Sequence, residues 1–86
     1  MSEVTMYTSS SCTFCKQAEA LMLKKGIKNI SKIYIDDNES QLLLMINRTK
    51  RRTVPQIFIG TTYVGGFDNL AKLDRDGELN SLLLNT

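Results

Sequence analysis

The fold is decided by one stretch, Tyr7-Thr8-Ser9-Ser10-Ser11-Cys12-Thr13-Phe14-Cys15-Lys16, which holds the two cysteines of the chain. The β-branched and aromatic run Val4–Thr8 leads into this stretch and predicts a strand, which we expect to be central. An amphipathic pattern over residues 15–25 leads out of it and predicts a helix that stops at Gly26. The cysteines are therefore expected at a strand-to-helix turn, where backbone N–H groups lack partners within the helix.

The helix that follows this turn has an inward face and a cap that the sequence suggests. Cys15, Ala18 and Met22 recur at helical spacing and are predicted to face the core. Ser10 or Ser11 is expected to cap the helix, because a hydroxyl accepts a hydrogen bond from the first turn.

The middle of the chain predicts a second strand and a second helix. The strand is expected over residues 32–35, with its start left open. The helix is expected over residues 39–48, with Asn38 and Gln41 forming a capping box. Its inward side chains are predicted to be Leu42, Leu43, Met45 and Ile46. A strand, a helix and a strand in this order predict a parallel crossover.

The last third of the chain predicts a hairpin and two short helices. Residues 56–59 and 62–64 flank a turn at Gly60-Thr61. A short helix through Leu70 and Leu73 is expected to be capped by Asp68 or Asn69, and residues 78–84 add a last apolar helical segment. The order βαβα followed by ββα predicts a single α/β domain over residues 1–86, with a small mixed sheet and helices on its faces.

Length and composition exclude several classes of protein. The 86 residues are 42% hydrophobic and 23% charged, which is ordinary for a globular domain. The longest apolar run, Leu42–Ile46, is far shorter than the ~20 residues of a membrane span. A net charge of +2 does not point to nucleic acid. Met1–Val4 does not resemble the start of a signal peptide, so we expect a cytoplasmic protein with neither a membrane nor a nucleic-acid partner.

The spacing of Cys12 and Cys15 favours redox chemistry. A sulfur at a helix start lies near free N–H groups and the positive end of the helix dipole, both of which favour the thiolate. Residues i and i+3 of a helix lie about 5–6 Å apart, within the range of a disulfide. Two alternatives remain open: two buried apolar cysteines, or half of a zinc site. Zinc needs four ligands, and the chain has no other cysteine and no histidine.

Thr53-Val54-Pro55 contains the single proline of the chain, immediately before a predicted strand. Such a proline can carry a cis peptide bond, which would turn backbone groups of Val54 toward an extended ligand. It can equally begin an edge strand. The sequence leaves both readings open.

Three segments together resemble the dithiol glutaredoxins of the small bacterial type: residues 7–15, residues 53–59 and residues 65–70. The resemblance implies a thioredoxin-like fold with a four-stranded mixed sheet. It implies glutathione as co-substrate and reductant, glutathionylated or disulfide-containing proteins as substrates, a monomer, and no metal. Ribonucleotide reductase is one substrate that the resemblance leaves open.

The resemblance also assigns roles to residues. Cys12 is the implied nucleophile and Cys15 the resolving thiol. The implied glutathione-binding residues are Phe14, Arg52, Thr53, Val54, Pro55, Gly66, Phe67 and Asp68. Within this set, Arg52 would meet a carboxylate of glutathione and Asp68 its ammonium group. The other basic residues of the run, Arg48, Lys50 and Arg51, are expected to form a solvated loop or a weak polyanion patch.

Departures from the family pattern open two further hypotheses. Thr13-Phe14 stands where many members have Pro-Tyr, and Ser9 where many have Lys; we still expect Cys12 to be largely thiolate at pH 7. Some members without that Pro hold a [2Fe–2S] cluster between two protomers, with glutathione as co-ligand. A redoxin coupled to thioredoxin reductase is the other hypothesis, which the short length and the lack of Trp disfavour.

Overall fold

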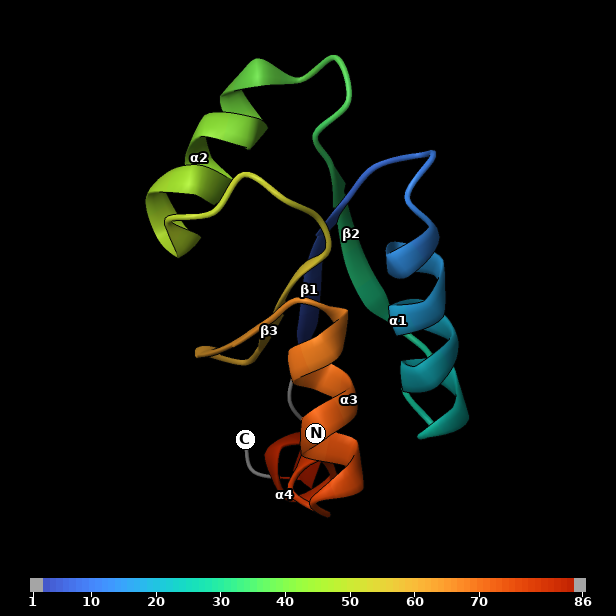
Figure 1. Cartoon of the computed structure of the whole chain (residues 1–86). Coiled ribbons are helices and arrows are strands. Elements are labelled where there is room, and N and C mark those ends of the chain that lie inside the picture. The colour runs from blue at the N-terminus through green and yellow to red at the C-terminus, as the bar shows by residue number, and fades with distance from the viewer. Residues whose placement is uncertain (1–2, 85–86) are drawn as a thin grey trace.

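Four strands form one mixed sheet in the computed structural model, which describes residues 3–84 (Figure 1). The same residues also form four helices. In chain order the elements are β1 (Val4–Thr8), α1 (Thr13–Lys24), β2 (Ile30–Tyr34), α2 (Glu39–Thr49), β3 (Gln56–Ile59), β4 (Thr62–Gly65), α3 (Phe67–Arg75) and α4 (Leu79–Leu84).

The sheet has the order β2-β1-β3-β4, so β1 is central as predicted. β1 pairs with β2 in parallel, and this pairing requires the crossover that α1 supplies. β3 runs antiparallel to β1 and to β4, and the β3–β4 pair is the predicted hairpin. These pairings confirm the predicted four-stranded mixed sheet.

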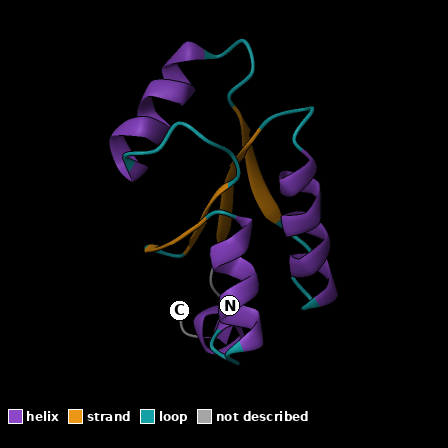
Figure 2. Cartoon of the chain, viewed as in Figure 1, coloured by secondary structure: helices purple, strands orange, loops and turns teal. Residues whose placement is uncertain are grey.

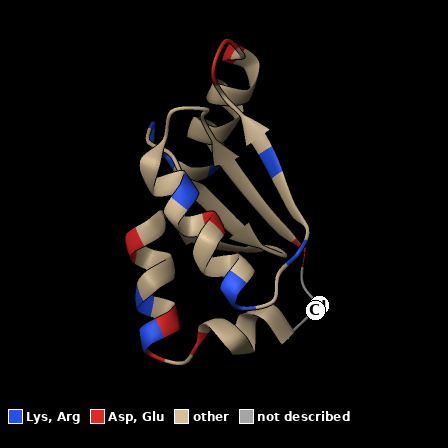
Figure 3. Ribbon diagram, turned by 90° about the vertical axis from the view of Figure 1, so that its right-hand side faces the viewer, with Lys and Arg blue, Asp and Glu red and all other residues tan. Residues whose placement is uncertain are grey.

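Helices cover both faces of the sheet, with α1 and α3 on one face and α2 on the other (Figures 1 and 2). Side chains alternate between the faces along each strand. Met6 and Ile57 therefore pack with Met22 and Leu70 on the α1 and α3 side. The neighbouring side chains Tyr7 and Phe58 pack with Met45 on the α2 side. The β1 and β3 segments carry no charged residue, whereas Lys, Arg, Asp and Glu lie on helices, loops and the edge strand β2 (Figure 3).

The cap of α1 differs from the prediction. The helix begins at Thr13, and its N-cap is Cys12, whose sulfur accepts a hydrogen bond from the Cys15 N–H. Ser10 and Ser11 were the wrong candidates. Ser10 instead donates two hydrogen bonds to Asp36, a contact between segments 26 residues apart. The predicted inward face of Cys15, Ala18 and Met22 is confirmed, since all three are buried.

Two other helices differ in detail. In α2, Met45 is buried and Leu42 and Ile46 pack against it, but Leu43 is 57% exposed, so its predicted inward position is wrong. The buried face repeats at 42, 45, 46 and 49, and Leu43 falls outside that stripe. Asn38 caps α2 through the Gln41 N–H as expected. The N-cap of α3 is Gly66 rather than Asp68 or Asn69, because the helix already begins at Phe67.

β2 begins at Ile30, two residues before the predicted strand, and ends at Tyr34. None of the helices within residues 3–84 has the length and hydrophobicity that crossing a bilayer requires.

Candidate active site

The two cysteines form a disulfide at the start of α1, with their Cα atoms 5.2 Å apart. This separation confirms the predicted disulfide range. Cys15 is 2% exposed and belongs to the core between α1 and the sheet. Cys12 is partly exposed. The alternative of two buried apolar cysteines is therefore wrong for Cys12. Of the two sulfurs, Cys12 is the one that an external disulfide can approach.

The first turn of α1 surrounds Cys12 Sγ with groups that favour negative charge. The Cys15 N–H donates to this sulfur across 3.0 Å. This N–H is one of the donors that a helix start leaves without an intrahelical partner. Together with the helix dipole it stabilises a thiolate at Cys12 once the disulfide is reduced. The carbonyl oxygen of Val54 lies 3.6 Å from the same sulfur and brings the loop before β3 to the site.

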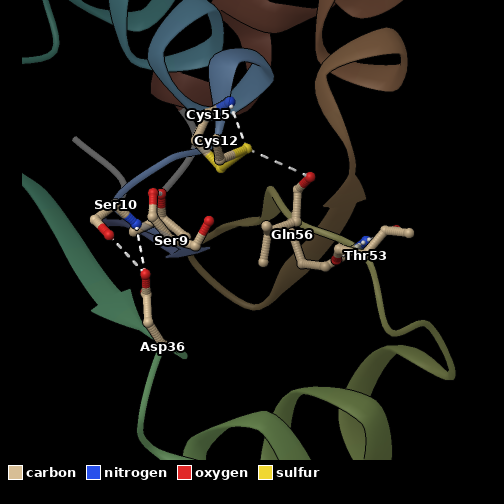
Figure 4. The surroundings of a disulfide bond; sticks show 9 residues. Ser9, Ser10, Cys12, Cys15, Asp36, Thr53 and Gln56 are labelled. Carbon is tan, nitrogen blue, oxygen red and sulfur yellow. Dashed lines mark hydrogen bonds between the residues drawn. A yellow bond between two sulfur atoms is a disulfide. The ribbon is translucent and has the colours of Figure 1, made fainter.

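The loop that precedes Cys12 is fastened to the end of β2. The N–H and the hydroxyl of Ser10 donate to one carboxylate oxygen of Asp36, across 3.0 and 2.7 Å. Figure 4 shows this pair on one side of the cysteines, and Thr53 and Gln56 on the other. The two donors hold the pKa of Asp36 below its ordinary value, with the hydroxyl as the larger cause.

The Asp36–Ser10 contact predicts a pH-dependent stability. Because folding lowers the pKa of Asp36, the stabilisation is present above the unfolded value of about 4 and is lost as the pH falls through the folded value. Ser10→Ala should therefore lower the free energy of unfolding at pH 7 but much less at pH 3. Urea unfolding at both pH values measures this, with Ser11→Ala as the matched control. An equal loss for Ser10→Ala at both pH values would contradict the assignment.

A hollow of about 300 Å³ opens beside the cysteines. It lies between the loop before β3 and the start of α3. Its walls are formed by Phe14, Arg51, Thr53, Val54, Pro55, Gln56, Gly66, Phe67, Asp68 and Asn69. Phe14 and Phe67 stack at one wall with ring centroids 6.2 Å apart, and Phe14 is 56% exposed. This volume is at the lower end of the range of small-molecule sites.

The hollow brings together segments that lie far apart in the sequence. Every residue that the resemblance assigned to glutathione binding lines it, except Arg52. Arg51, which was expected to belong to a solvated loop or a weak polyanion patch, lines it instead. Gln56 and Asn69 also line the hollow and were not predicted. The signal for Asn69 was its place in the first turn after Gly65-Gly66, where its side chain accepts a hydrogen bond from the Gly66 N–H.

Arg48 does not belong to a solvated loop, contrary to expectation. It lies in the last turn of α2 with its guanidinium 4.0 Å from the centroid of the Phe58 ring. It also donates to the Tyr7 hydroxyl across 3.0 Å. Arg48 therefore packs α2 onto the sheet, through a cation–π contact and a hydrogen bond.

The open question at Pro55 is answered by the backbone. The Val54–Pro55 peptide bond is cis. Pro55 is buried and precedes β3, which is an inner strand. The edge-strand reading is therefore wrong.

No group of three or more His, Cys, Asp or Glu residues that could hold a metal ion occurs within residues 3–84.

Comparison with known proteins points to one family. A family model described as glutaredoxin matches residues 4–64. A glutaredoxin of Neisseria meningitidis is 41% identical over 83 residues, which are 96% of this chain and 98% of that protein. Glutaredoxin 3 of Escherichia coli is 42% identical over 83 residues, which are 96% of this chain and 99% of that protein.

Solved structures agree with the sequence comparisons. The solution structure of a glutaredoxin from Brucella melitensis superposes with a TM-score of 0.84 at 40% identity, over 96% of this chain and 89% of that one. A crystal structure of a buckwheat glutaredoxin–glutathione complex superposes with a TM-score of 0.87 at 27% identity, over 95% of this chain and 76% of that one.

Proposed function

The chain belongs to the glutaredoxin family and is a thiol–disulfide oxidoreductase, and we propose that glutathione is its reductant. Its proposed substrates are glutathionylated proteins and protein disulfides. The observation that carries this proposal is the position of Cys12. Its sulfur lies 3.6 Å from the carbonyl oxygen of Val54, and Val54 lines the hollow beside it.

The chemistry of the hollow suits glutathione, which has two carboxylates and one ammonium group. Arg51 supplies a cation from the loop before β3, and Asp68 supplies an anion from the first turn of α3. Opposite charges from two separate elements favour a ligand that carries both signs. The Val54 N–H has no acceptor within residues 3–84. A backbone carbonyl of an extended tripeptide would satisfy it.

The proposed reaction proceeds in two exchanges. The Cys12 thiolate attacks the glutathione sulfur of a protein–glutathione disulfide. The S–S bond of the substrate breaks, the substrate leaves as its thiolate, and a Cys12–glutathione disulfide forms. A second glutathione thiolate then attacks the bound glutathione sulfur, which releases glutathione disulfide and restores the Cys12 thiolate.

Cys15 provides the alternative second step. Its thiolate attacks Cys12 Sγ, releases one glutathione thiolate and leaves the Cys12–Cys15 disulfide that the structure contains. Two glutathione molecules reduce that disulfide again. No side chain acts as a general base in either route, since catalysis rests on the thiolate and on its position.

The experiment that tests this function is the reduction of hydroxyethyl disulfide, with glutathione and glutathione reductase supplying electrons. We expect turnover that saturates with glutathione. A parallel assay with thioredoxin reductase in place of glutathione and its reductase should give little turnover. Activity with thioredoxin reductase alone would instead favour the hypothesis of a redoxin coupled to thioredoxin reductase. The iron–sulfur hypothesis stays a prediction, which an absorbance spectrum of anaerobically purified protein would test.

The two neighbouring arginines provide a test of the ligand site. Because Arg51 lines the hollow and Arg52 does not, Arg51→Ala should raise the KM for a glutathionylated peptide more than Arg52→Ala does. We expect an increase of about three- to tenfold for Arg51→Ala, since an exposed charged pair contributes up to about 1 kcal/mol and a hydrogen bond to a charged group somewhat more. Steady-state kinetics of both variants measures the difference. The reverse ranking would restore the role that the resemblance gave to Arg52.

A further inference from the structure

Gln56 is a buried polar residue on a strand that is otherwise apolar. Its exposed fraction is 1%, and Ile57, Phe58 and Ile59 complete β3. A buried amide is stabilising only when its hydrogen bonds are made. We propose that Gln56 is a positioning residue, which aims the backbone of Thr53 and Val54 at the bound glutathione, and that Tyr63 acts through it. This inference rests on the proposed function.

The side-chain amide of Gln56 joins two segments. Its Nε2 donates to the backbone carbonyl of Thr53 across 3.0 Å and lies 3.3 Å from the Thr53 hydroxyl. Its Oε1 accepts a hydrogen bond from the Tyr63 hydroxyl on β4. The carbonyl of Thr53 can only accept, so the NH₂ group of Gln56 has to face it and the amide oxygen has to face Tyr63. The partners therefore fix which way the amide lies.

The bond to the Thr53 carbonyl determines where the Val54 N–H points. These two groups belong to one peptide unit, which is planar, and the cis bond of this loop is the next one, Val54–Pro55. In a trans peptide the C=O and N–H point in opposite directions. Because Gln56 holds the Thr53 carbonyl toward the interior, the Val54 N–H is directed away from Gln56. That N–H has no acceptor within the described residues.

Tyr63 can influence the site only indirectly. It does not line the hollow that Val54 lines. Its ring packs on Phe58 with centroids 5.1 Å apart, and its hydroxyl reaches Gln56. Gln56 itself lines the hollow, so a direct contact with the ligand would be a competing explanation for any effect of changing it. Removing the Tyr63 hydroxyl separates the two explanations, because Gln56 then remains in place.

The experiment compares four single variants, and one double variant that combines Gln56→Met with Tyr63→Phe, with the wild type. The substrates are a glutathionylated peptide and the same peptide capped with cysteamine. Gln56→Met keeps the length of the side chain and removes its hydrogen bonds. Gln56→Glu keeps an acceptor for Tyr63 and loses the donors to Thr53. Tyr63→Phe keeps the ring on Phe58. Ile59→Val is the control, since it trims a buried side chain of the same strand on the other face of the sheet.

We expect both Gln56 variants to raise the KM for the glutathionylated peptide about tenfold, with kcat changed less than about twofold, since one lost buried hydrogen bond corresponds to about that factor. Tyr63→Phe should raise the KM about two- to threefold, and Gln56→Met with Tyr63→Phe should not exceed Gln56→Met alone, because the two side chains act in series. Ile59→Val should lower the melting temperature and leave the KM unchanged. The NMR shift of the Val54 amide should move in the Gln56 and Tyr63 variants only.

Other outcomes overturn the inference. An unchanged KM in folded Gln56→Met and Tyr63→Phe proteins would contradict it. Additive effects of the two substitutions on the KM of the double variant would also contradict it. An equal rise in KM for Ile59→Val would show a general loss of stability instead of positioning. Should Gln56→Met fail to fold, Tyr63→Phe alone decides. A wild type that shows no preference for the glutathionylated over the cysteamine-capped peptide contradicts the proposed function, whereas a preference that no variant alters contradicts only this inference.

Discussion

Replacing Cys12 by serine should reduce every thiol–disulfide activity of the protein by at least about three orders of magnitude, because a serine hydroxyl does not ionise to a nucleophile at neutral pH. Cys15→Ser should behave differently. It should keep the reduction of glutathionylated peptides within about twofold of the wild type, because the second exchange can use glutathione in place of Cys15.

The structure gives a specific reason for this division. The hydrogen bond that Cys12 Sγ accepts comes from the backbone N–H of Cys15. The Cys15→Ser variant therefore retains it. Cys15 Sγ is buried and is needed only to form the internal disulfide. Reduction of a protein disulfide by the dithiol route should therefore be lost in Cys15→Ser. Assays of both variants on a glutathionylated peptide and on a protein disulfide measure the division, and an equal loss of both activities in Cys15→Ser would show that the roles are assigned wrongly.

Gly65→Ala should destabilise the protein more than Gly26→Ala does, with a cost of about 2–4 kcal/mol in the free energy of unfolding. Gly65 has φ +113°, a conformation that residues with a Cβ atom rarely adopt. An added Cβ would also lie 2.5 Å from Asn69 Oδ1. Asn69 would have to turn away and lose its hydrogen bond to the Gly66 N–H at the start of α3.

Gly26→Ala is the matched control for this prediction. Gly26 has a similar φ of +91°, but no atom lies within 4 Å of an added Cβ. Gly26→Ala should therefore lower the free energy of unfolding by the backbone strain alone, about 1–2 kcal/mol. Thermal unfolding measures both, since 1 kcal/mol corresponds to roughly 4–8 °C in a domain of this size. Adding Asn69→Ala should cost much less in the Gly65→Ala protein than in the wild type. Equal melting temperatures of the two glycine variants would mean that the contact with Asn69 is unimportant.

Local sequence patterns predicted most of the fold. The run of Val4–Thr8 predicted the central strand, and the spacing of Cys15, Ala18 and Met22 predicted the buried face of α1. These predictions succeeded because alternation and helical periodicity reflect burial directly. The pattern of α2 was less decisive, because the five consecutive apolar residues Leu42–Ile46 cannot all face inward on a helix. Leu43 was therefore predicted on the wrong side.

The remaining differences from the predictions concern the loops and contacts between distant segments. Ser10 looked like a helix cap, but its hydrogen bonds go to Asp36, and Cys12 takes the cap position. The choice between Arg51 and Arg52 depends on how the loop before β3 is turned, which adjacent positions in a basic run do not reveal. Gln56 was read only as part of a strand, because its partner Tyr63 lies across the hairpin. Long-range partners of polar side chains have no local sequence signature.

In the proposed function, the folded start of α1 makes Cys12 reactive toward glutathione disulfides. The test measures how fast reduced Cys15→Ser protein takes up one glutathione on Cys12 from glutathione disulfide at pH 7. Mass spectrometry monitors the uptake, and the rate for the folded protein is compared with the rate for the same protein unfolded in urea. An ordinary cysteine thiol with a pKa of about 8.5 is only a few per cent thiolate at this pH. We therefore expect a rate at least about tenfold higher in the folded state. A folded rate equal to or below the unfolded rate would contradict it.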